Sequence, residues 1–244
     1  MKRYTVEEID HLVEGGIIAS CQPIAGGPLD QDEIVAAMAM ACINGGAKSL
    51  RIEGAARVAK MRRLSDIPII GIVKRELENT GVCITPNVDD VLALADAGAD
   101  IIAFDATDRA RPTRREHIVE AILGQDCHAM ADCASMSDVH FALSLDVGFV
   151  GTTLAGYLGG HTPEEPDYEF LTSAVEVAPR VIAEGRYNTP ERAREARRLG
   201  AWGVVVGTAL TRLEIMTAWF VEGMATISSE QEEWFRHKGR KIGV

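Results

Sequence analysis

The 244-residue chain lacks the features of several large protein classes. Its net charge of -11 and the absence of a Lys/Arg stripe with interleaved aromatics argue against a nucleic-acid binder, because neutralising phosphates requires a basic face. No apolar run approaches the roughly 20 residues that a membrane-spanning helix needs, and the polar start is unlike a signal peptide. We therefore expect a cytoplasmic protein with neither a nucleic-acid nor a membrane partner.

Metal-binding and dinucleotide-binding signatures are also missing. The five cysteines are odd in number and form no C-x-x-C pair, so we expect reduced and mostly buried thiols. The six histidines are scattered and form no zinc-type motif, and we expect no metal site. No G-x-G-x-x-G motif with a following ribose-binding acid occurs, which argues against a dinucleotide-binding protein.

What the chain does contain is a repeated unit of helix followed by buried strand. A helix ends at glycine, alanine follows and a strand begins at Gly46, Gly98 and Gly200, as expected for a left-handed glycine cap. Eight strands are predicted, near residues 16–21, 46–54, 69–73, 101–104, 127–131, 149–152, 181–183 and 203–206. Eight alternating units fit a closed (β/α)8 barrel better than an open doubly wound sheet, although counting alone leaves both open.

The helices should begin at recognisable caps. The predicted N-caps are Thr5 with Glu8 for a lead-in helix over 5–14, Thr85 or Asn87, Thr113, Ser135 or Ser137, and Thr189 with Pro190. A last helix is predicted over 212–221. We expect one α/β domain over residues 1–221, a TIM barrel with its lead-in helix, and a C-terminal helical extension over 222–244, which is more often a solvated end than a subunit contact.

Polar residues end most of the strands. In a barrel the C-terminal ends of all strands meet on one face, so these residues would line a single pocket. They are Gln22, Arg51, Lys74, Asp105, Asp132, Thr152, Glu184 and Gly207.

Lys74 ends the buried run at 68–73 and allows three interpretations. It is a proton-transferring base, a Schiff-base nucleophile, or the ion-pair partner of a carboxylate such as Glu53. The base hypothesis needs a pKa lowered from about 10.4 to about 7–8, which partial burial and nearby Arg51 would favour. Arg51 is likewise either a core partner of Glu53 or a ligand for substrate oxygen.

Three strand-end carboxylates carry the same kind of ambiguity. Glu184 stands before a glycine that lets the backbone approach a ligand, but it could instead pair with Arg186 or Arg51. Asp105 and Asp132 could each orient substrate hydroxyl groups or pair with a core cation. A purely structural role in ion pairs is harder to assign to five charged residues at one barrel mouth than to any one of them alone.

The eighth unit fits a phosphate site. Barrel enzymes often bind phosphate with the loops after the last two strands, where glycine amides and a helix N-terminus meet the anion. Gly185, Gly207, Thr208 and Arg212 are placed to do so, and the alternative is an ordinary glycine turn with a helix cap.

These motifs closely resemble one family over residues 15–220. They are SCQP at 20–23, LRIEG at 50–54, PIIGIVKR at 68–75, ITP at 84–86, GADIIAFDAT at 98–107, RP at 111–112 and IAEGR at 182–186. The family is N-acetylmannosamine-6-phosphate 2-epimerase. The chain departs from its pattern at Glu76-Leu77 and at Leu213, where a proline is common.

The resemblance implies a phosphate-binding TIM barrel that interconverts N-acetylmannosamine 6-phosphate and N-acetylglucosamine 6-phosphate in sialic acid breakdown. It implies an isomerase without a cofactor, whose partner is a small amino-sugar phosphate. We also expect a homo-oligomer, with a dimer favoured over larger assemblies. Lys74 would move the C2 proton while Glu184 assists. The substrate-binding set it implies is Gln22, Arg51, Asp132, Gly185, Arg186, Gly207, Thr208 and Arg212, with Asp105 as substrate support or as a partner behind the ligands.

Two hypotheses from other classes remain open on the residues alone. A Schiff-base aldolase acting on a phosphorylated keto acid would use Lys74 as its covalent residue. A non-catalytic sugar-phosphate-binding barrel would bind the same ligand without converting it.

Overall fold

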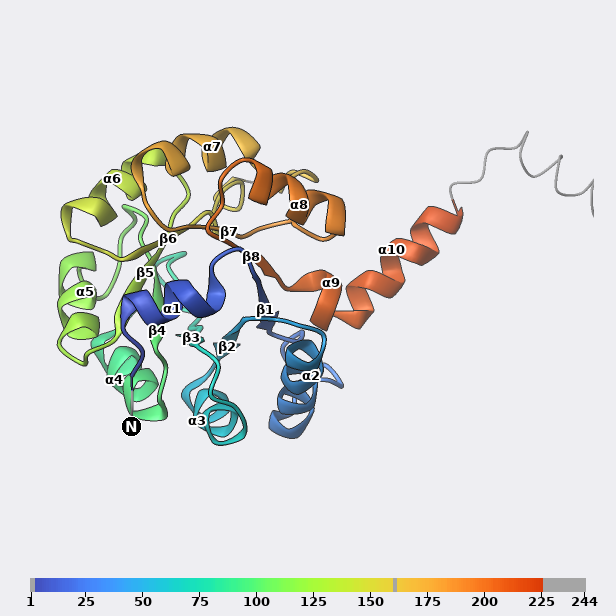
Figure 1. Ribbon diagram of the computed structural model, residues 1–244, viewed down its shortest axis with the longest axis horizontal. Helices are drawn as coiled ribbons and strands as arrows, with labels where there is room; N and C mark the ends of the chain where they lie inside the picture. Colours follow the sequence, from blue (N-terminus) through green and yellow to red (C-terminus); the bar gives the residue numbers. More distant parts are fainter. Residues whose placement is uncertain (1–2, 160–161, 226–244) are drawn as a thin grey trace, which may run out of the picture.

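The computed structural model describes residues 3–159 and 162–225 of the chain. Eight parallel strands form a closed barrel in sequence order, with helices around the outside (Figure 1). The strands are β1 Ile17–Cys21, β2 Ser49–Glu53, β3 Ile69–Ile72, β4 Ile101–Asp105, β5 His128–Asp132, β6 Phe149–Gly151, β7 Val181–Ala183 and β8 Gly203–Val206. The prediction of a TIM barrel is confirmed, and the open doubly wound sheet is excluded because β1 pairs with β8.

The helices follow the strands in regular alternation. They are α1 Val6–Val13, α2 Asp32–Asn44, α3 Ala55–Leu64, α4 Val88–Ala97, α5 Arg115–Leu123, α6 Met136–Ser144, α7 Tyr168–Val177, α8 Pro190–Arg198, α9 Thr208–Thr211 and α10 Leu213–Ala225. The repeated glycine stop is confirmed, because Gly46, Gly98 and Gly200 have φ of 101°, 92° and 98°, a region that favours glycine.

Most predicted helix starts are confirmed by the capping contacts. Thr5 and Glu8 form a reciprocal capping box, and the Thr189 side chain accepts from the amide of Arg192. Asn87 and Ser135 are the N-caps of α4 and α6. The cap at Thr113 was wrong by one residue: the N-cap of α5 is Arg114, which makes no side-chain capping bond.

The inside of the barrel is apolar at its base and polar at its mouth. Ile70 and Ile72 belong to an inner cluster together with Ile101, Phe149, Ile182 and Val205, all of them buried. Side chains alternate between the two faces of a strand, so the residue two positions further along also points inward. Two positions after Ile72 of β3 is Lys74, and two positions after Ile182 of β7 is Glu184. The strand alternation therefore directs both side chains to the mouth of the barrel.

Helix α1 closes the base of the barrel. Ile9 and Val13 are buried in the inner cluster, and Figure 1 shows α1 lying across the barrel end. Asp10 holds the helix in place: its carboxylate accepts two hydrogen bonds from Arg180 at 2.7 and 2.6 Å and one from the Trp202 indole at 2.9 Å. The lead-in helix is thus part of the barrel.

Helix α10 leaves the barrel instead of packing on it (Figure 1). None of its residues is buried, and Phe220, Val221 and Met224 are 69%, 64% and 73% exposed. The predicted helix over 212–221 is confirmed as a helix, although it runs on to Ala225. The rest of the predicted extension, residues 226–244, lies outside the described residues.

Two smaller predictions concern membrane spans and cysteines. Within the described ranges, every helix is too short or too polar to cross a bilayer. Cys21, Cys127 and Cys133 are buried, and Cys42 and Cys83 are partly exposed, so the thiols are mostly buried as predicted.

Replacing Asp10 should loosen the base of the barrel. Asp10→Ala removes the acceptor of Arg180 and of the Trp202 indole, and we expect a loss of about 1–2 kcal/mol in unfolding free energy, or roughly 2–8 °C in Tm. The pKa of Asp10 is lowered, chiefly by the hydrogen bond from Arg180. Its contribution is therefore present above the unfolded-state pKa and is lost as pH falls through the lowered folded value. Thermal unfolding at pH 7 measures the effect.

The matched control is Asp108→Ala, which removes an ion pair to Arg115 whose carboxylate side is 89% exposed. It should change the unfolding free energy by about 0.5 kcal/mol or less. Equal effects of the two substitutions would show that Asp10 does not anchor α1.

Candidate active site

A cavity of about 330 Å³ opens at the C-terminal ends of the strands. Eight of the predicted site residues line it: Gln22, Lys74, Glu184, Gly185, Arg186, Gly207, Thr208 and Arg212. Arg51 and Asp132 lie beneath its floor and are 1% and 0% exposed. Asp105 does not line the cavity.

Lys74 is accessible from the cavity and its ammonium is not neutralised by a neighbouring acid. Among the described residues, no carboxylate lies within ion-pair distance of Nζ. Glu53, the partner considered from the sequence, instead accepts from the backbone amide of Lys74 at 3.4 Å, while its other oxygen lies 3.7 Å from Arg57. The amine is thus free to act on a ligand.

The surroundings of Lys74 favour its neutral form. The pKa of Lys74 is lowered, first by desolvation and then by the positive charges of Arg212 and Arg51. The negative charge of ionised Glu184 opposes this shift. A lowered pKa is what the proton-transfer hypothesis requires.

A short hairpin fixes the backbone on either side of Lys74. Lys74 forms an isolated antiparallel bridge with Ile84, and the amide of Thr85 donates to the carbonyl of Val73 at 2.7 Å. Thr85 has a φ of 45°, which is rare for a β-branched residue, and its hydroxyl donates to Ala103 at 2.7 Å. The strained threonine therefore ties the lysine-bearing segment to β4.

Arg51 lies between two carboxylates under the cavity floor. Its Nη1 and Nη2 donate to Asp132 Oδ1 and Oδ2 at 3.2 and 2.6 Å. Its Nε lies 3.3 Å from Glu184 Oε1, an ion pair that is not aligned as a hydrogen bond. Burial lowers the pKa of Arg51, but Asp132 and Glu184 outweigh burial, and the net shift is upward. The guanidinium is therefore a permanent cation shared by two acids.

Glu184 has a strongly shifted pKa. Its pKa is raised to about 7, first by desolvation and also by Asp132, against the opposing effects of Arg51, Thr153 and Lys74. Its side chain is 13% exposed, on the cavity side. Glu184 and Lys74 thus face one cavity, and the pKa of each is shifted toward neutrality.

Thr153 is a site residue that the sequence interpretation missed. Its hydroxyl lies 2.6 Å from Asp132 Oδ1 and 3.2 Å from Glu184 Oε2. The residue chosen from the sequence, Thr152, instead donates to the backbone carbonyl of Glu184 at 2.8 Å. Strand alternation carried the signal: Thr153 is four positions after Phe149, which points inward, and so shares its face.

The expected phosphate residues surround the other end of the cavity. Arg212 donates through Nε to the carbonyl of Gln22 at 3.0 Å, and within the described part of the chain its guanidinium has no carboxylate partner. Gly207 is the N-cap of the one-turn helix α9, and the Thr211 hydroxyl ties α9 to Ser20 of β1 at 2.8 Å. Gly185 has a φ of 104°, which favours glycine.

Arg186 lies at the rim and is committed to the loop before α7. It donates to the carbonyls of Ala155 and Glu165 at 2.8 and 2.7 Å and lies 5.0 Å from the centre of the Tyr157 ring. The ion pair from Glu184 to Arg186 considered from the sequence is not formed. Glu184 pairs with Arg51 instead.

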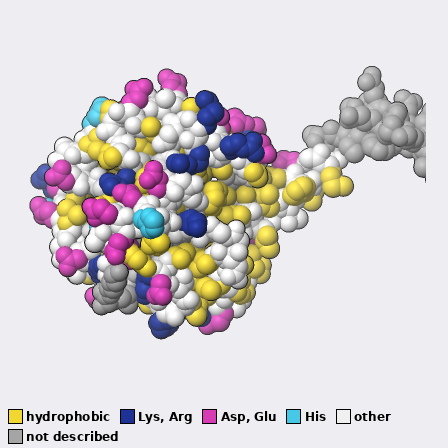
Figure 2. Space-filling model, in the orientation of Figure 1, with side chains coloured by type: hydrophobic (Ala, Val, Ile, Leu, Met, Phe, Trp, Pro, Cys, Tyr) yellow, Lys and Arg dark blue, Asp and Glu magenta, His cyan; other side chains and the backbone are white. Residues whose placement is uncertain are grey.

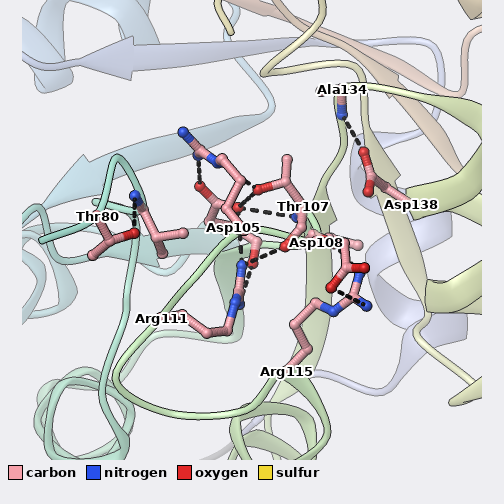
Figure 3. A network of polar contacts seen from close by, with 12 residues as sticks. Thr80, Asp105, Thr107, Asp108, Arg111, Arg115, Ala134 and Asp138 are labelled. Atoms are coloured by element: carbon pink, nitrogen blue, oxygen red, sulfur yellow. Dashed lines mark hydrogen bonds and ion pairs between the residues drawn. The ribbon is translucent and has the colours of Figure 1, made fainter.

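Asp105 serves a separate network, shown in Figure 3. Its buried carboxylate pairs with Arg109 and lies 3.2 Å from Arg111, and it also accepts from the amide of Thr107 at 3.0 Å. Both arginines come from the loop between β4 and α5. The sequence left two roles open for Asp105, orienting substrate hydroxyl groups or pairing with a core cation. The observed contacts are those of the second role.

No group of three or more His, Cys, Asp or Glu side chains within residues 3–159 and 162–225 is arranged to hold a metal ion. Within these ranges, the cavity is lined by the amine of Lys74, the carboxyl of Glu184 and two guanidinium groups without a carboxylate partner, those of Arg186 and Arg212. That set suits proton transfer on an anionic small molecule.

Comparison with known proteins agrees with this chemistry. Residues 35–226 match the family described as "Putative N-acetylmannosamine-6-phosphate epimerase". The chain belongs to this epimerase family. A relative from Pasteurella multocida (strain Pm70), named "Putative N-acetylmannosamine-6-phosphate 2-epimerase", is 48% identical over 92% of this chain and 98% of its own. A relative of the same name from Vibrio cholerae serotype O1 is 49% identical over 88% of this chain and 90% of its own.

Solved structures support the epimerase fold. The N-acetylmannosamine-6-phosphate 2-epimerase from Clostridium perfringens superposes with a TM-score of 0.86 at 34% identity, covering 91% of this chain and 99% of that one. A tryptophan synthase α-subunit from Pyrococcus furiosus has a TM-score of 0.59 at 17% identity, and this likeness shows the barrel alone.

Removing the shared cation should destabilise the barrel in a pH-dependent way. In Arg51→Met two acids are left in the floor without their partner, and we expect a loss of about 3–5 kcal/mol at neutral pH. Arg51 opposes the upward shift in the pKa of Glu184, so the folded-state pKa rises further in the variant. An acid with a raised folded pKa destabilises more as pH rises, so the deficit should be larger at pH 8 than at pH 5.

Denaturant unfolding at the two pH values measures this. The control is Arg198→Met, which breaks an exposed ion pair with Glu195 and should have the same unfolding free energy as the parent at both pH values. A deficit of Arg51→Met that does not change with pH would mean that lost packing, and not the unpaired acids, is the cause.

Proposed function

We propose that this barrel epimerises C2 of N-acetylmannosamine 6-phosphate to give N-acetylglucosamine 6-phosphate in sialic acid breakdown, with Lys74 and Glu184 as the proton-transferring residues. The observation that carries the proposal is that two groups face one cavity: an amine with a lowered pKa and no carboxylate partner among the described residues, and a carboxyl with a pKa of about 7. Groups whose pKa values are moved toward neutrality from opposite sides suit acid and base roles.

The chemistry follows from the acidity of C2. In the open-chain sugar C2 lies beside the C1 aldehyde, so removing its proton gives an enolate. Neutral Lys74 takes this proton and becomes an ammonium. Protonated Glu184 returns a proton to the opposite face, which inverts the centre, and the reverse reaction uses ionised Glu184 and the Lys74 ammonium.

The remaining residues would bind and orient the substrate. Arg212, with the backbone of Gly185, Gly207 and Thr208, would hold the phosphate, since Arg212 has a guanidinium without an acid partner and glycine allows close approach. Gln22 would contact the acetamido or hydroxyl groups, because it lines the cavity.

Arg51 and Asp132 would act on the same sugar groups from beneath the floor, and Arg186 would close the rim. Asp105 would support the loop behind the site. The family membership and the largely buried thiols also support a cytoplasmic location.

We further propose a homodimer in which α10 of one copy packs on the other. In a (β/α)8 barrel the helix after the last strand normally packs on the outer face. Here α10 points away, and a groove lined by Ile17, Met38, Ala41 and Leu210 is left open between α2 and α9. Figure 2 shows hydrophobic side chains gathered where α9 and α10 leave the barrel. An apolar helix and an apolar groove that do not meet within one chain fit a second copy.

Replacing Lys74 tests the reaction. Lys74→Met should lower kcat by about 10²–10⁴-fold, because the general base is lost while the shape of the site is kept. The assay supplies purified protein and the two amino-sugar phosphates without added cofactor. In deuterated water the parent should place deuterium at C2 of both sugars.

Lys60→Met, at a surface lysine of α3 that pairs with Glu33, is the control and should keep full turnover. Near-normal turnover of folded Lys74→Met would end the assignment of the base. A parent protein that binds both sugars and converts neither would contradict the epimerase proposal.

Changing the exposed face of α10 tests the dimer. Sedimentation of the parent should give twice the chain mass of 26.4 kDa. Phe220→Asp places a charge on the apolar face and should shift the mass toward the monomer at micromolar concentration. Leu92→Asp, at an exposed leucine of α4, should leave the dimer intact. A monomeric parent at these concentrations would overturn the proposal.

A further inference from the structure

Among the described residues, one hydroxyl group lies within hydrogen-bonding distance of the Glu184 carboxyl, that of Thr153 in the cavity wall. Arg51 uses both of its Nη groups on Asp132, and its Nε faces Glu184 at 3.3 Å without the alignment of a hydrogen bond. The hydrogen-bonding contact that remains for the Glu184 carboxyl is the hydroxyl of Thr153, at 3.2 Å from Oε2. The Glu184 carboxyl is therefore held by an ion pair with Arg51 at one oxygen and by an uncharged hydroxyl at the other.

The Thr153 hydroxyl can serve Glu184 in both protonation states. It carries one hydrogen and accepts through its lone pairs. When Glu184 is protonated, Thr153 donates to Asp132 Oδ1 at 2.6 Å and accepts from Glu184. When Glu184 is ionised, the hydroxyl turns to donate to it, and Asp132 keeps the two bonds from Arg51. The carboxyl can stay in one place while its charge changes.

The barrel leaves room for this hydroxyl through a glycine. A Cβ on Gly151 would lie 2.8 Å from Thr153 Oγ1 and 3.2 Å from Asp132 Oδ1. Glycine at the end of β6 thus permits the close contact between Thr153 and Asp132. The same Cβ would also lie 2.5 Å from Met130 Cε, so glycine at this position makes room for Met130 as well as for Thr153.

We propose that Thr153 is a positioning residue for the epimerisation, which holds the Glu184 carboxyl in one orientation through both halves of the proton transfer. The inference rests on the proposed function for its effect on turnover. The coupling of Thr153 to Glu184 can be measured without substrate.

The other charges around Glu184 set the direction of the expected shift. They are Arg51 from β2, Lys74 after β3 and Asp132 from β5, and Thr153 lowers the pKa of Glu184. An ionised carboxylate gains about twice as much from a hydroxyl donor as a neutral acid does. The neutral acid can also donate to water in the cavity. Loss of the hydroxyl should therefore raise the pKa of Glu184.

Thr153→Val keeps the shape of the side chain and removes the hydroxyl, and Thr153→Ser keeps the hydroxyl. We expect Thr153→Val to lower kcat about tenfold or more with a smaller change in KM, and Thr153→Ser to recover most of the loss. The acid limb of kcat/KM should move to higher pH by about one unit in Thr153→Val. Ionisation of the substrate phosphate cancels in this comparison, since both proteins use the same substrate.

The substrate-free measurement is the titration of Glu184 followed by carbon-13 NMR of labelled glutamate side chains, with Glu184→Gln to assign the signal. Its pKa should rise in Thr153→Val and return in Thr153→Ser. Thr172→Val, which removes an exposed hydroxyl on α7 bonded to the carbonyl of Tyr168, is the control and should match the parent in every assay.

Equal impairment of the valine and serine variants, or an unmoved titration of Glu184 in Thr153→Val, would overturn the proposal. Should Thr153→Val not fold, Thr153→Ala gives the same comparison with serine. A parent protein without epimerase activity would refute the proposed function, while the NMR titration would still decide whether Thr153 controls Glu184.

Discussion

The structure depends on the cation of Arg51, buried under the cavity floor. It neutralises Asp132 by a two-point contact and lies within ion-pair distance of Glu184, so two acids share one positive charge. Removing three charged groups from water is costly, and it is tolerated only where the charges compensate one another. With Lys74 above them, the four groups can reach a net charge of zero, and the proton transfer proposed for Lys74 and Glu184 would leave that sum unchanged.

Much of the fold and of the site could be predicted because both follow from short-range rules. Buried runs, glycine stops and caps located all eight strands, and the convergence of strand ends in a barrel collected Lys74, Glu184 and Gln22. The error in choosing site residues arises where a strand passes into the following loop. Thr152 was chosen because it ends the predicted strand at 149–152, whereas the side-chain alternation makes Thr153 the inward residue. Counting from the apolar inward residues of each strand would have avoided this error.

Other features depend on contacts that no local pattern contains. Asp105 has the right strand and the right face, paired in register with Asp132. Asp105 does not line the cavity because it pairs with Arg109 and Arg111 from the following loop. The spacing of the residues in that loop does not predict its path. Helix α10 is similar: its apolar sequence predicts a helix that needs a partner, but not which surface, or which copy of the chain, provides it.

Desolvation is what makes the two proposed catalytic groups a pair. Desolvation disfavours the charged form of each, so it lowers the pKa of Lys74, whose side chain is exposed at the cavity, and raises that of the more deeply buried Glu184. In water the charged pair of ammonium and carboxylate would dominate, and neither member could accept or give a proton in the forward direction. In the cavity both pKa shifts favour the neutral pair relative to the charged pair. The two pairs carry the same number of protons, and each is the productive form for one direction of the reaction. A reversible epimerase needs both to be accessible at the same pH, and under the proposed roles the lowered pKa of Lys74 and the raised pKa of Glu184 favour this.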